Sequence, residues 1–161
     1  SAKLIENSKF FFASREEGEN RIVLLNKFIS EHPNSSKSMD AYYAVIGYYK
    51  SIQDTINEAN TYTKMIANYP QDIWILNGYS WRMSQIEKNL DDALEKAKIA
   101  VILAESDPSS CAMILDTQAE VLWKMQRYND AVDIINKAIS IDPSSDYYKE
   151  QKDKFLLSSS Y

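Results

Sequence analysis

Residues 112–143 read AMILDTQAEVLWKMQRYNDAVDIINKAISIDP, which is two stretches of helical apolar spacing followed by a proline. The chain has four prolines, and successive ones lie 37, 38 and 35 residues apart, from Pro33 through Pro70 and Pro108 to Pro143. A period of this length is typical of repeat proteins built from helix-turn-helix units. Because one such unit cannot bury its apolar face alone, neighbouring units must stack. The sequence therefore predicts an all-α fold of the α-solenoid type, with about four helical pairs.

We expect a single domain over residues 1–161, made of four units, a capping helix and a polar tail. The units cover about 2–36, 38–71, 73–110 and 112–145, the capping helix 146–157 and the tail 158–161. Each unit is expected to contain two helices. In chain order the four pairs cover about 2–14 and 20–31, 38–52 and 55–68, 73–86 and 91–107, and 112–125 and 129–141.

Glycine and proline are expected to mark the turns. Gly18, within the charged stretch 15–19, stops one helix and permits the chain to reverse. Each proline is expected to end the second helix of its unit. In the third unit that helix begins near Asp91, and it is about one turn too long because Pro108 comes late.

Composition limits the classes of partner. The formal net charge is −5 at pH 7, which disfavours nucleic acid because phosphate binding needs clustered Lys and Arg. The single cysteine, Cys111, excludes an internal disulfide. The sequence contains no apolar run of about 18 residues, so it predicts no membrane span. The chain begins at Ser1 and not Met, so we expect a processed protein or an excised segment, and the sequence does not indicate its localisation.

The fourth unit resembles the tetratricopeptide repeat (TPR) family over a whole repeat. The matching positions, large and small along two antiparallel helices, are Leu115, Ala119, Leu122, Tyr128, Ala131, Ile135, Ala138 and Pro143. In the third unit they are Leu76, Ser80, Leu90, Ala93, Ala97 and Ala100. We expect the alanines where helices approach most closely, with larger side chains filling the spaces between them. The two N-terminal units depart from the pattern, since Arg21 and Glu58 stand where the family usually has alanine. The resemblance implies a right-handed superhelix.

The resemblance also implies a function. TPR domains use the first helix of each pair to line a concave groove that receives an extended peptide or a partner helix. Transferred to this chain, the groove positions are Trp74, Asn77, Trp81 and Gln85, then Met113, Asp116, Glu120, Trp123 and Lys124, then Asp40, Tyr43 and Lys50. All three tryptophans fall in this set, and exposed aromatic side chains are enriched at binding hot spots. The alternative is that these rings are partly buried packing residues.

The acidic groove positions indicate the chemistry of a partner. Chaperone-binding TPR domains grip a peptide carboxylate with Lys, Asn and Arg side chains, and this chain lacks those cations at the corresponding places. Glu6, Asp40, Asp116 and Glu120 better match a partner with basic or aromatic and apolar residues. The alternative is that each carboxylate is an ordinary solvated helix position.

Candidate catalytic residues are few, so we expect no enzyme, cofactor or metal site. His32 is the only histidine, and its place at a helix end explains it. Cys111 is expected near a helix start, where a lowered pKa would make it reactive; a small packing residue is the other interpretation. The pairs 16–17 and 91–92 are acidic, but each falls in a turn or a first helical turn, where acids are common.

A second class of function remains open. The third and fourth units are similar to helical repeats found beside thioredoxin-like domains in some bacterial proteins. Because no Cys-X-X-Cys occurs in this chain, any redox activity would belong to another domain. In that case the chain is a structural or oligomerisation segment of a larger protein, and self-association is expected.

Overall fold

The computed structural model describes residues 2–158, and within that range every regular element is a helix. The nine helices are α1 (Ala2–Arg15), α2 (Gly18–Glu31), α3 (Ser38–Ser51), α4 (Thr55–Asn68), α5 (Ile73–Ile86), α6 (Leu90–Leu103), α7 (Pro108–Lys124), α8 (Tyr128–Ile141) and α9 (Asp146–Ser158). The predicted all-α class is therefore confirmed for the described part of the chain. Each helix packs on the next within its own part of the chain, which is consistent with a helical repeat, and the right-handed superhelix stays a prediction.

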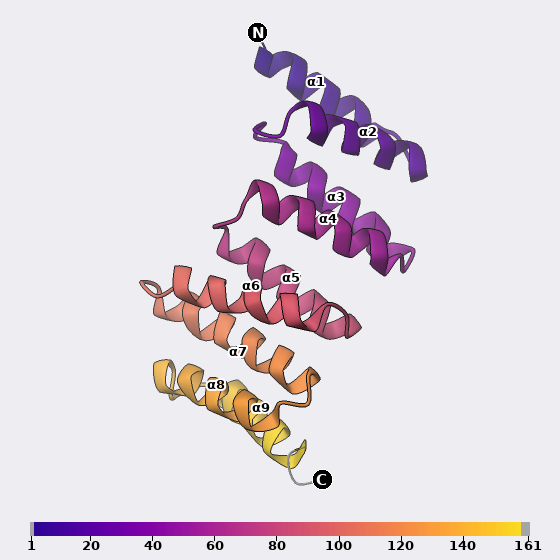
Figure 1. Cartoon of the computed structure of the whole chain (residues 1–161). Coiled ribbons are helices and arrows are strands. Elements are labelled where there is room, and N and C mark those ends of the chain that lie inside the picture. The colour runs from indigo at the N-terminus through magenta and orange to yellow at the C-terminus, as the bar shows by residue number, and fades with distance from the viewer. Residues whose placement is uncertain (1, 159–161) are drawn as a thin grey trace. The chain divides into compact units, whose positions relative to one another are not determined.

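Contacts divide the chain into two compact units, one ending at Tyr69 and the other beginning at Pro70. The first unit contains α1 to α4, which follow one another as short antiparallel neighbours (Figure 1). Phe28 of α2 is almost completely buried, and its ring centroid lies 5.6 Å from that of Phe10 on α1. Gly18 has a φ of +56°, a backbone conformation that favours glycine and suits the reversal of the chain between α1 and α2. It does not stop the first helix as predicted, because α1 already ends at Arg15 and Gly18 is the first residue of α2.

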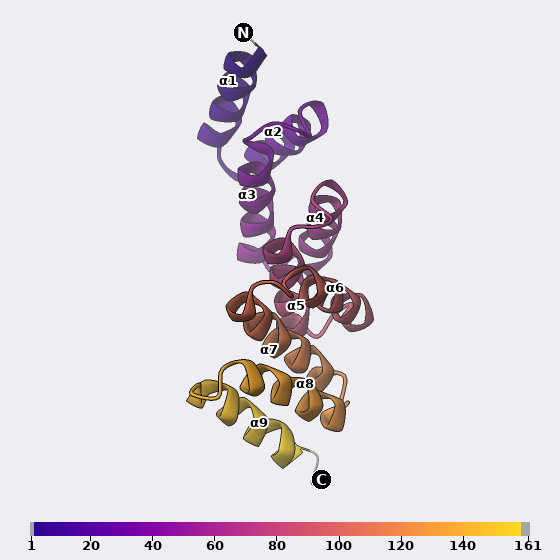
Figure 2. The same cartoon turned by 90° about the vertical axis from the view of Figure 1, so that its left-hand side faces the viewer.

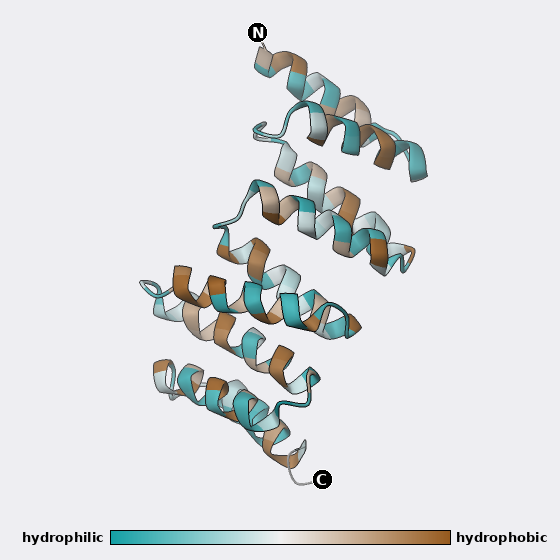
Figure 3. Cartoon of the chain, viewed as in Figure 1, coloured by the Kyte–Doolittle hydropathy of each residue, from teal (hydrophilic) through white to brown (hydrophobic). Residues whose placement is uncertain are grey.

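The second unit contains α5 to α9. Each of these helices contacts the next, and α5 also packs against α7, so the first helices of successive pairs are neighbours (Figure 2). Most helices of both units carry hydrophobic as well as hydrophilic segments, as expected of helices that bury one side (Figure 3).

Small residues lie where the helices of the second unit meet. The small residues of these helices that are completely buried include Ser80, Ser84, Ala93, Ala97, Ala100, Ala119, Ala131 and Ala138. The Ser80 hydroxyl donates to the Ala93 carbonyl across the α5–α6 interface over 2.8 Å, which requires the two backbones to be close. The predicted places of closest approach are thus filled by small side chains.

The expectation that every proline ends the second helix of its unit was wrong at Pro108. Helix α6 ends at Leu103, and Pro108 is the first residue of α7, with the Asp107 carboxylate accepting from the Ser110 backbone N–H as N-cap. Proline suits this position because the first helical N–H has no acceptor inside the helix. The sixth helix is therefore not extended, and it is α7 that is longer, starting four residues before the expected Ala112.

The last helix contains Ser158, one residue of the expected polar tail, while residues 159–161 lie outside the described range. None of the described helices is both long enough and apolar enough to cross a membrane. Helix α9 packs on α8, and its side chains also reach α7, where five of the twelve predicted groove residues lie. It therefore decides which of those residues remain accessible.

Candidate functional site

Three of the predicted groove residues present large exposed side chains in the second unit. Trp74 and Trp81 on α5 are 47% and 41% exposed, and Met113 on α7 is 48% exposed. Gln85, at the end of α5, is also exposed. Tyr147, in the first turn of α9, adds an exposed aromatic ring that the groove pattern did not include. One face of α5, α7 and α9 thus has aromatic and thioether side chains in contact with solvent.

A hollow of about 360 Å³ lies among these side chains, and we call it the Trp81 hollow. Its lining residues come from α5, α7, α9 and the turn before α9, and they are Asn77, Trp81, Met113, Asp116, Thr117, Ser145, Tyr147 and Tyr148. The sequence pattern identified Asn77, Trp81, Met113 and Asp116. It missed Tyr147 and Tyr148, whose only signal is their place at the start of the helix that follows the fourth pair.

Asp116 is the buried acid of the Trp81 hollow. Its residue is 8% exposed, and its carboxylate accepts a hydrogen bond from the Tyr147 hydroxyl over 3.1 Å. Burial raises the pKa of Asp116 to about 6, and the neighbouring Glu120 charge acts in the same direction. The Tyr147 hydrogen bond and the Lys154 charge act against that rise, but they do not cancel it. Burial and the two nearby carboxylates also raise the pKa of Tyr147, to about 12, so that this hydroxyl remains a donor.

Asn77 contributes a polar atom without a partner. Its amide oxygen Oδ1 is buried and accepts no hydrogen bond within the described part of the chain. A buried acceptor that is left unpaired costs about 1–3 kcal/mol, so such atoms are few in native structures. Since Asn77 lines the Trp81 hollow, a ligand with an N–H or O–H donor could satisfy this oxygen.

Glu120 and Trp123 are held by α9, although the groove pattern placed them with the exposed residues. Glu120 is 6% exposed, and Lys154 of α9 donates to its carboxylate over 2.5 Å. The Lys154 ammonium also lies 4.4 Å from the centroid of the Trp123 ring, which packs against Phe155 at 6.1 Å. We call these four residues the Lys154 contact. The Trp123 indole N–H donates to the Ser158 hydroxyl over 2.8 Å, so the ring is half-buried under α9.

Lys124 forms an outer version of the same arrangement. Its ammonium lies 4.8 Å from the Trp123 ring centroid and donates to the Glu87 carboxylate over 2.9 Å. The Glu87 side chain is 64% exposed, in contrast to Glu120. Trp123 is therefore contacted by two lysines, each paired with a glutamate.

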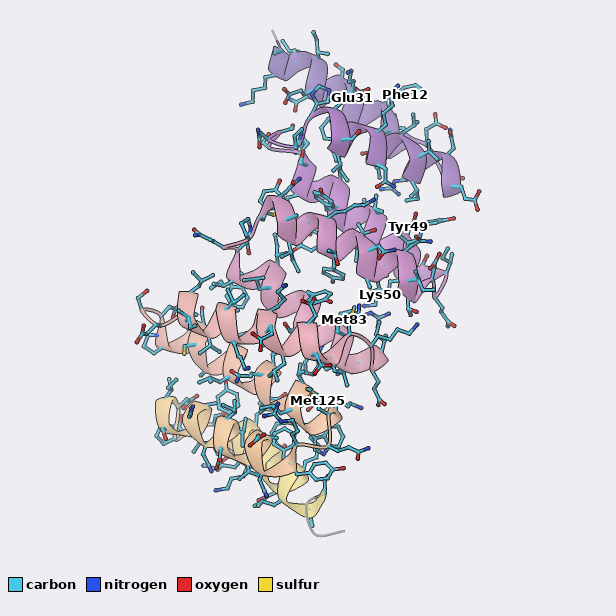
Figure 4. All side chains as sticks on the ribbon, in the orientation of Figure 1. Phe12, Glu31, Tyr49, Lys50, Met83 and Met125 are labelled. Carbon is cyan, nitrogen blue, oxygen red and sulfur yellow. The ribbon has the colours of Figure 1, made fainter. Side chains whose placement is uncertain are left out.

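The remaining predicted positions belong to the first unit and lie on α3. The Asp40 carboxylate accepts from Lys37 over 3.2 Å, and Tyr43 and Lys50 are exposed. Lys50 and its chain neighbour Tyr49, both labelled in Figure 4, belong to the last turn of α3. A groove that includes these residues together with those of the second unit stays a prediction.

The first unit also has a hollow that the sequence did not indicate. It measures about 490 Å³ between α1 and α2, and its lining residues are Ser8, Lys9, Phe12, Ala13, Leu24, Lys27, Phe28 and Glu31. Phe12 and Glu31 are labelled on these two helices in Figure 4. Lys9 donates to Glu31 over 2.9 Å, so the apolar hollow has a charged rim. Exposed Leu4, Ile5, Phe11 and Phe12 make α1 the most apolar exposed helix face of this unit.

The contacts of His32 and the surroundings of Cys111 are those of residues that support the fold. The His32 ring lies 3.2 Å from the Lys9 ammonium, and its backbone N–H caps α2 by donating to Phe28. Burial raises the pKa of the Cys111 thiol, and the charges of Glu105 and Asp107 act in the same direction, so the lowered pKa of the reactive-thiol hypothesis was wrong. Among residues 2–158, no group of three or more acidic, histidine or cysteine side chains is placed to hold a metal ion.

The acidic pairs serve local structure. Glu16 accepts from the Asn20 side chain over 2.8 Å across the first turn of α2. Asp92 accepts from the buried Tyr79 hydroxyl over 2.7 Å, and Lys96 lies 3.0 Å from its carboxylate. Both contacts join or cap helices, as expected of acids at these places.

A scan against models of known protein families gave no match for this chain, and a search of the curated proteins gave none either.

Proposed function

We propose that this chain is a protein-binding scaffold whose second unit holds a peptide or a partner helix on the face formed by α5, α7 and α9. The spacing of large and small residues in α5 to α8 resembles the TPR family, in which first helices line the binding groove. The proposed role is recognition without catalysis or a cofactor. The observation that carries it is the Trp81 hollow, where exposed Trp81, Met113 and Tyr147 surround buried polar groups.

This combination is what a binding site requires. Aromatic and methionine side chains supply contact area, while a few convergent polar groups fix the orientation of a ligand. The buried polar groups here are the Asp116 carboxylate and the Asn77 amide oxygen, both acceptors. Acceptors favour a partner that brings donors, so we propose a partner segment with basic and aromatic or apolar residues rather than nucleic acid.

The test is capture of partners from an extract of the source cell. We compare the intact chain with a Trp74→Ala/Trp81→Ala variant, because both rings are largely exposed and their removal spares the core. The control is Ile99→Ala/Ile102→Ala on α6, which also removes exposed apolar side chains from the second unit. A partner identified by mass spectrometry is then purified and titrated by calorimetry.

We expect the tryptophan variant to bind that partner at least about tenfold more weakly, since exposed aromatic anchors dominate such interfaces. The α6 control is expected to bind with unchanged affinity. If the tryptophan variant binds as the intact chain does, the α5–α7–α9 face is not the binding surface.

A second candidate function is self-association as a segment of a larger protein. The observation that favours it is the exposed apolar side of α1, where Leu4, Ile5, Phe11 and Phe12 are each more than half exposed. Contiguous exposed apolar groups of this kind mark association surfaces. Light scattering on the intact chain and on Phe11→Ser/Phe12→Ser tests it: a dimer that the variant abolishes supports this function, and a monomer in both excludes it.

A further inference from the structure

Two carboxylates one turn apart on α7 are buried in similar places but have different partners. Glu120 is paired with the Lys154 ammonium, which lies over the Trp123 and Phe155 rings at 4.4 Å and 4.8 Å from their centroids. The chain thus provides one complete arrangement of a buried acid, a cation and an aromatic ring.

Asp116 is a buried acid with aromatic rings nearby, like Glu120, but no cation is paired with it among the described residues. It shares the Trp81 hollow with the exposed Trp81 ring and with Tyr147, which donates to it. No lysine, arginine or histidine of the described residues forms an ion pair with Asp116, and Lys154 is held by Glu120. A buried carboxylate without a cation is unfavourable, so a bound cation would be stabilised here.

The Asn77 amide oxygen supplies a second acceptor from a different helix. Asn77 belongs to the lining of the same hollow on the α5 side, while Asp116 belongs to it on the α7 side. Both oxygens lack donors that the chain could supply, apart from the Tyr147 hydroxyl on Asp116. Water could satisfy Asn77, but it would not neutralise the charge of Asp116.

The guanidinium group of arginine fits these features better than other biological cations. It is planar and always charged, it has five N–H donors, and it stacks on aromatic faces while being weakly hydrated. Two acceptors on separate helices and an indole ring match this set of properties. A lysine ammonium offers a point charge, which neither needs the Asn77 acceptor nor stacks in a plane on Trp81.

We propose that the Trp81 hollow receives the arginine side chain of a partner protein, with Asp116 and Asn77 accepting its N–H bonds and Trp81 stacking on its guanidinium plane. This inference rests on the proposed function, and it deepens that function by naming the anchor residue of the partner. It also assigns distinct roles to three residues of one hollow.

The probe is acetyl-arginine amide, which carries the side chain without any other partner contact. Its matched control is acetyl-citrulline amide, a neutral isostere that retains most of the hydrogen-bonding shape. Binding is followed on the full chain through the NMR shift of the Trp81 indole N–H, assigned with Trp81→Phe. We expect the arginine probe to shift this signal in a saturable way and the citrulline probe to bind at least about tenfold more weakly, because charge-assisted hydrogen bonds are lost.

Variants of the hollow separate the three roles. Asp116→Asn keeps the shape and can still accept from Tyr147, so folding is retained, and we expect affinity for the arginine probe to fall at least about tenfold. Asn77→Ala is expected to weaken binding about fivefold. Trp81→Phe has no indole N–H, so its binding is followed through the backbone amide shift of Met113, which lines the same hollow, and is expected to weaken about threefold. The matched control is Asp133→Asn on α8, which does not line the hollow and should bind normally.

The pH dependence gives a readout that a merely structural residue would not change. The titratable groups that face Asp116 are Glu120 of α7 and Tyr147, Tyr148 and Lys154 of α9. Burial raises the pKa of Asp116 to about 6, so this carboxyl is mostly protonated at about pH 5, and affinity should fall about tenfold from its value at about pH 7.5. Asp116→Asn should remove this dependence, which also excludes His32 as its source.

The outcomes are decisive for the proposal. Equal binding of the citrulline probe, unchanged binding by Asp116→Asn, or no saturable shift with the arginine probe would each overturn it. Lysine amide acetylated on its α-amino group keeps the side-chain ammonium, and stronger binding of this compound than of the arginine probe would overturn the choice of guanidinium. If the probe fails while Trp74→Ala/Trp81→Ala still loses a captured partner, the proposed function stands and only the arginine anchor is wrong.

Discussion

Glu120 and Asp116 stand one helical turn apart on α7, and each is less than a tenth exposed. Glu120 is paired with Lys154 under α9, whereas Asp116 receives only a neutral hydroxyl from Tyr147. The same helix therefore has one buried charge that the fold neutralises and another that it leaves for the surroundings. We infer from this difference that the Lys154 contact stabilises the second unit, while the Trp81 hollow lowers its stability and is available to a ligand.

The largest effect is expected where α9 closes the Lys154 contact. Phe155 is completely buried against Trp123, so Phe155→Ala should lower the free energy of unfolding by about 3–4 kcal/mol through lost burial and a cavity. All three tryptophans belong to the second unit, so denaturation in urea followed by tryptophan fluorescence reports on that unit. The control is Leu157→Ala, whose side chain is exposed and should change stability by less than about 0.5 kcal/mol. A similar loss in both variants would mean that α9 is not docked through Phe155.

Removal of the cation comes next in size. Lys154→Ala leaves the Glu120 carboxylate buried without a partner and should cost about 2–3 kcal/mol, less than a fully buried pair because Lys154 is one-third exposed. The matched control on the same helix is Lys149→Ala, whose pair with the exposed Asp146 should contribute at most about 0.5 kcal/mol.

A double variant separates the charge from the packing in this contact. Lys154→Met/Glu120→Gln removes both charges and keeps most of the apolar volume, so it should regain most of the stability that Lys154→Ala loses. If the double variant is as unstable as the single one, the contact acts through packing of the lysine stem and not through charge.

For Asp116 we expect removal of the charge to raise the stability of the second unit, whereas removal of Lys154 lowers it. Its folded pKa of about 6 lies above the ordinary value of 3.8, so the folded state binds more protons between these pH values, and stability falls as the pH rises through them. The destabilisation is absent below the ordinary pKa and complete above pH 6. Asp116→Asn should therefore stabilise the second unit by about 1–2 kcal/mol at neutral pH and flatten this part of the pH profile. Asp133→Asn is the control, and a destabilised Asp116→Asn would mean that the charge already has a favourable partner.

The fold was predictable because the signals were local. Helical spacing and proline intervals predicted the all-α class, and the alanines expected at close approaches, such as Ala119 and Ala138, are completely buried. Pro108 misled the prediction because proline is suited both to the turn after a helix and to the first position of a helix. Spacing alone does not distinguish these two places.

The candidate site was predictable only in part. Trp81 and Met113 are exposed in the second unit, as positions on one side of first helices, but Asp116 and Glu120 are buried by α9. Tyr147 and Lys154 lie on α9, and they contact residues 31 and 34 positions earlier in the chain, on α7. A lysine whose stem packs while its ammonium reaches an acid is not distinguishable from a surface lysine by sequence pattern.

The smallest expected effect tests whether burial explains the contrast. Lys124 repeats the geometry of Lys154 on the same Trp123 ring, at 4.8 Å from its centroid, and pairs with a glutamate at 2.9 Å. That glutamate, Glu87, is 64% exposed, so water already stabilises its charge, and Lys124→Ala should cost no more than about 0.5 kcal/mol in urea denaturation. The two lysines share a ring and a pairing, and they differ chiefly in how far the paired carboxylate is removed from water. If Lys124→Ala lowers the free energy of unfolding as much as Lys154→Ala does, then the contact between the ammonium and the Trp123 ring determines both losses. Burial of the paired carboxylate would then add little, and a cation bound beside the buried Asp116 would be stabilised no more than one beside the exposed Glu87.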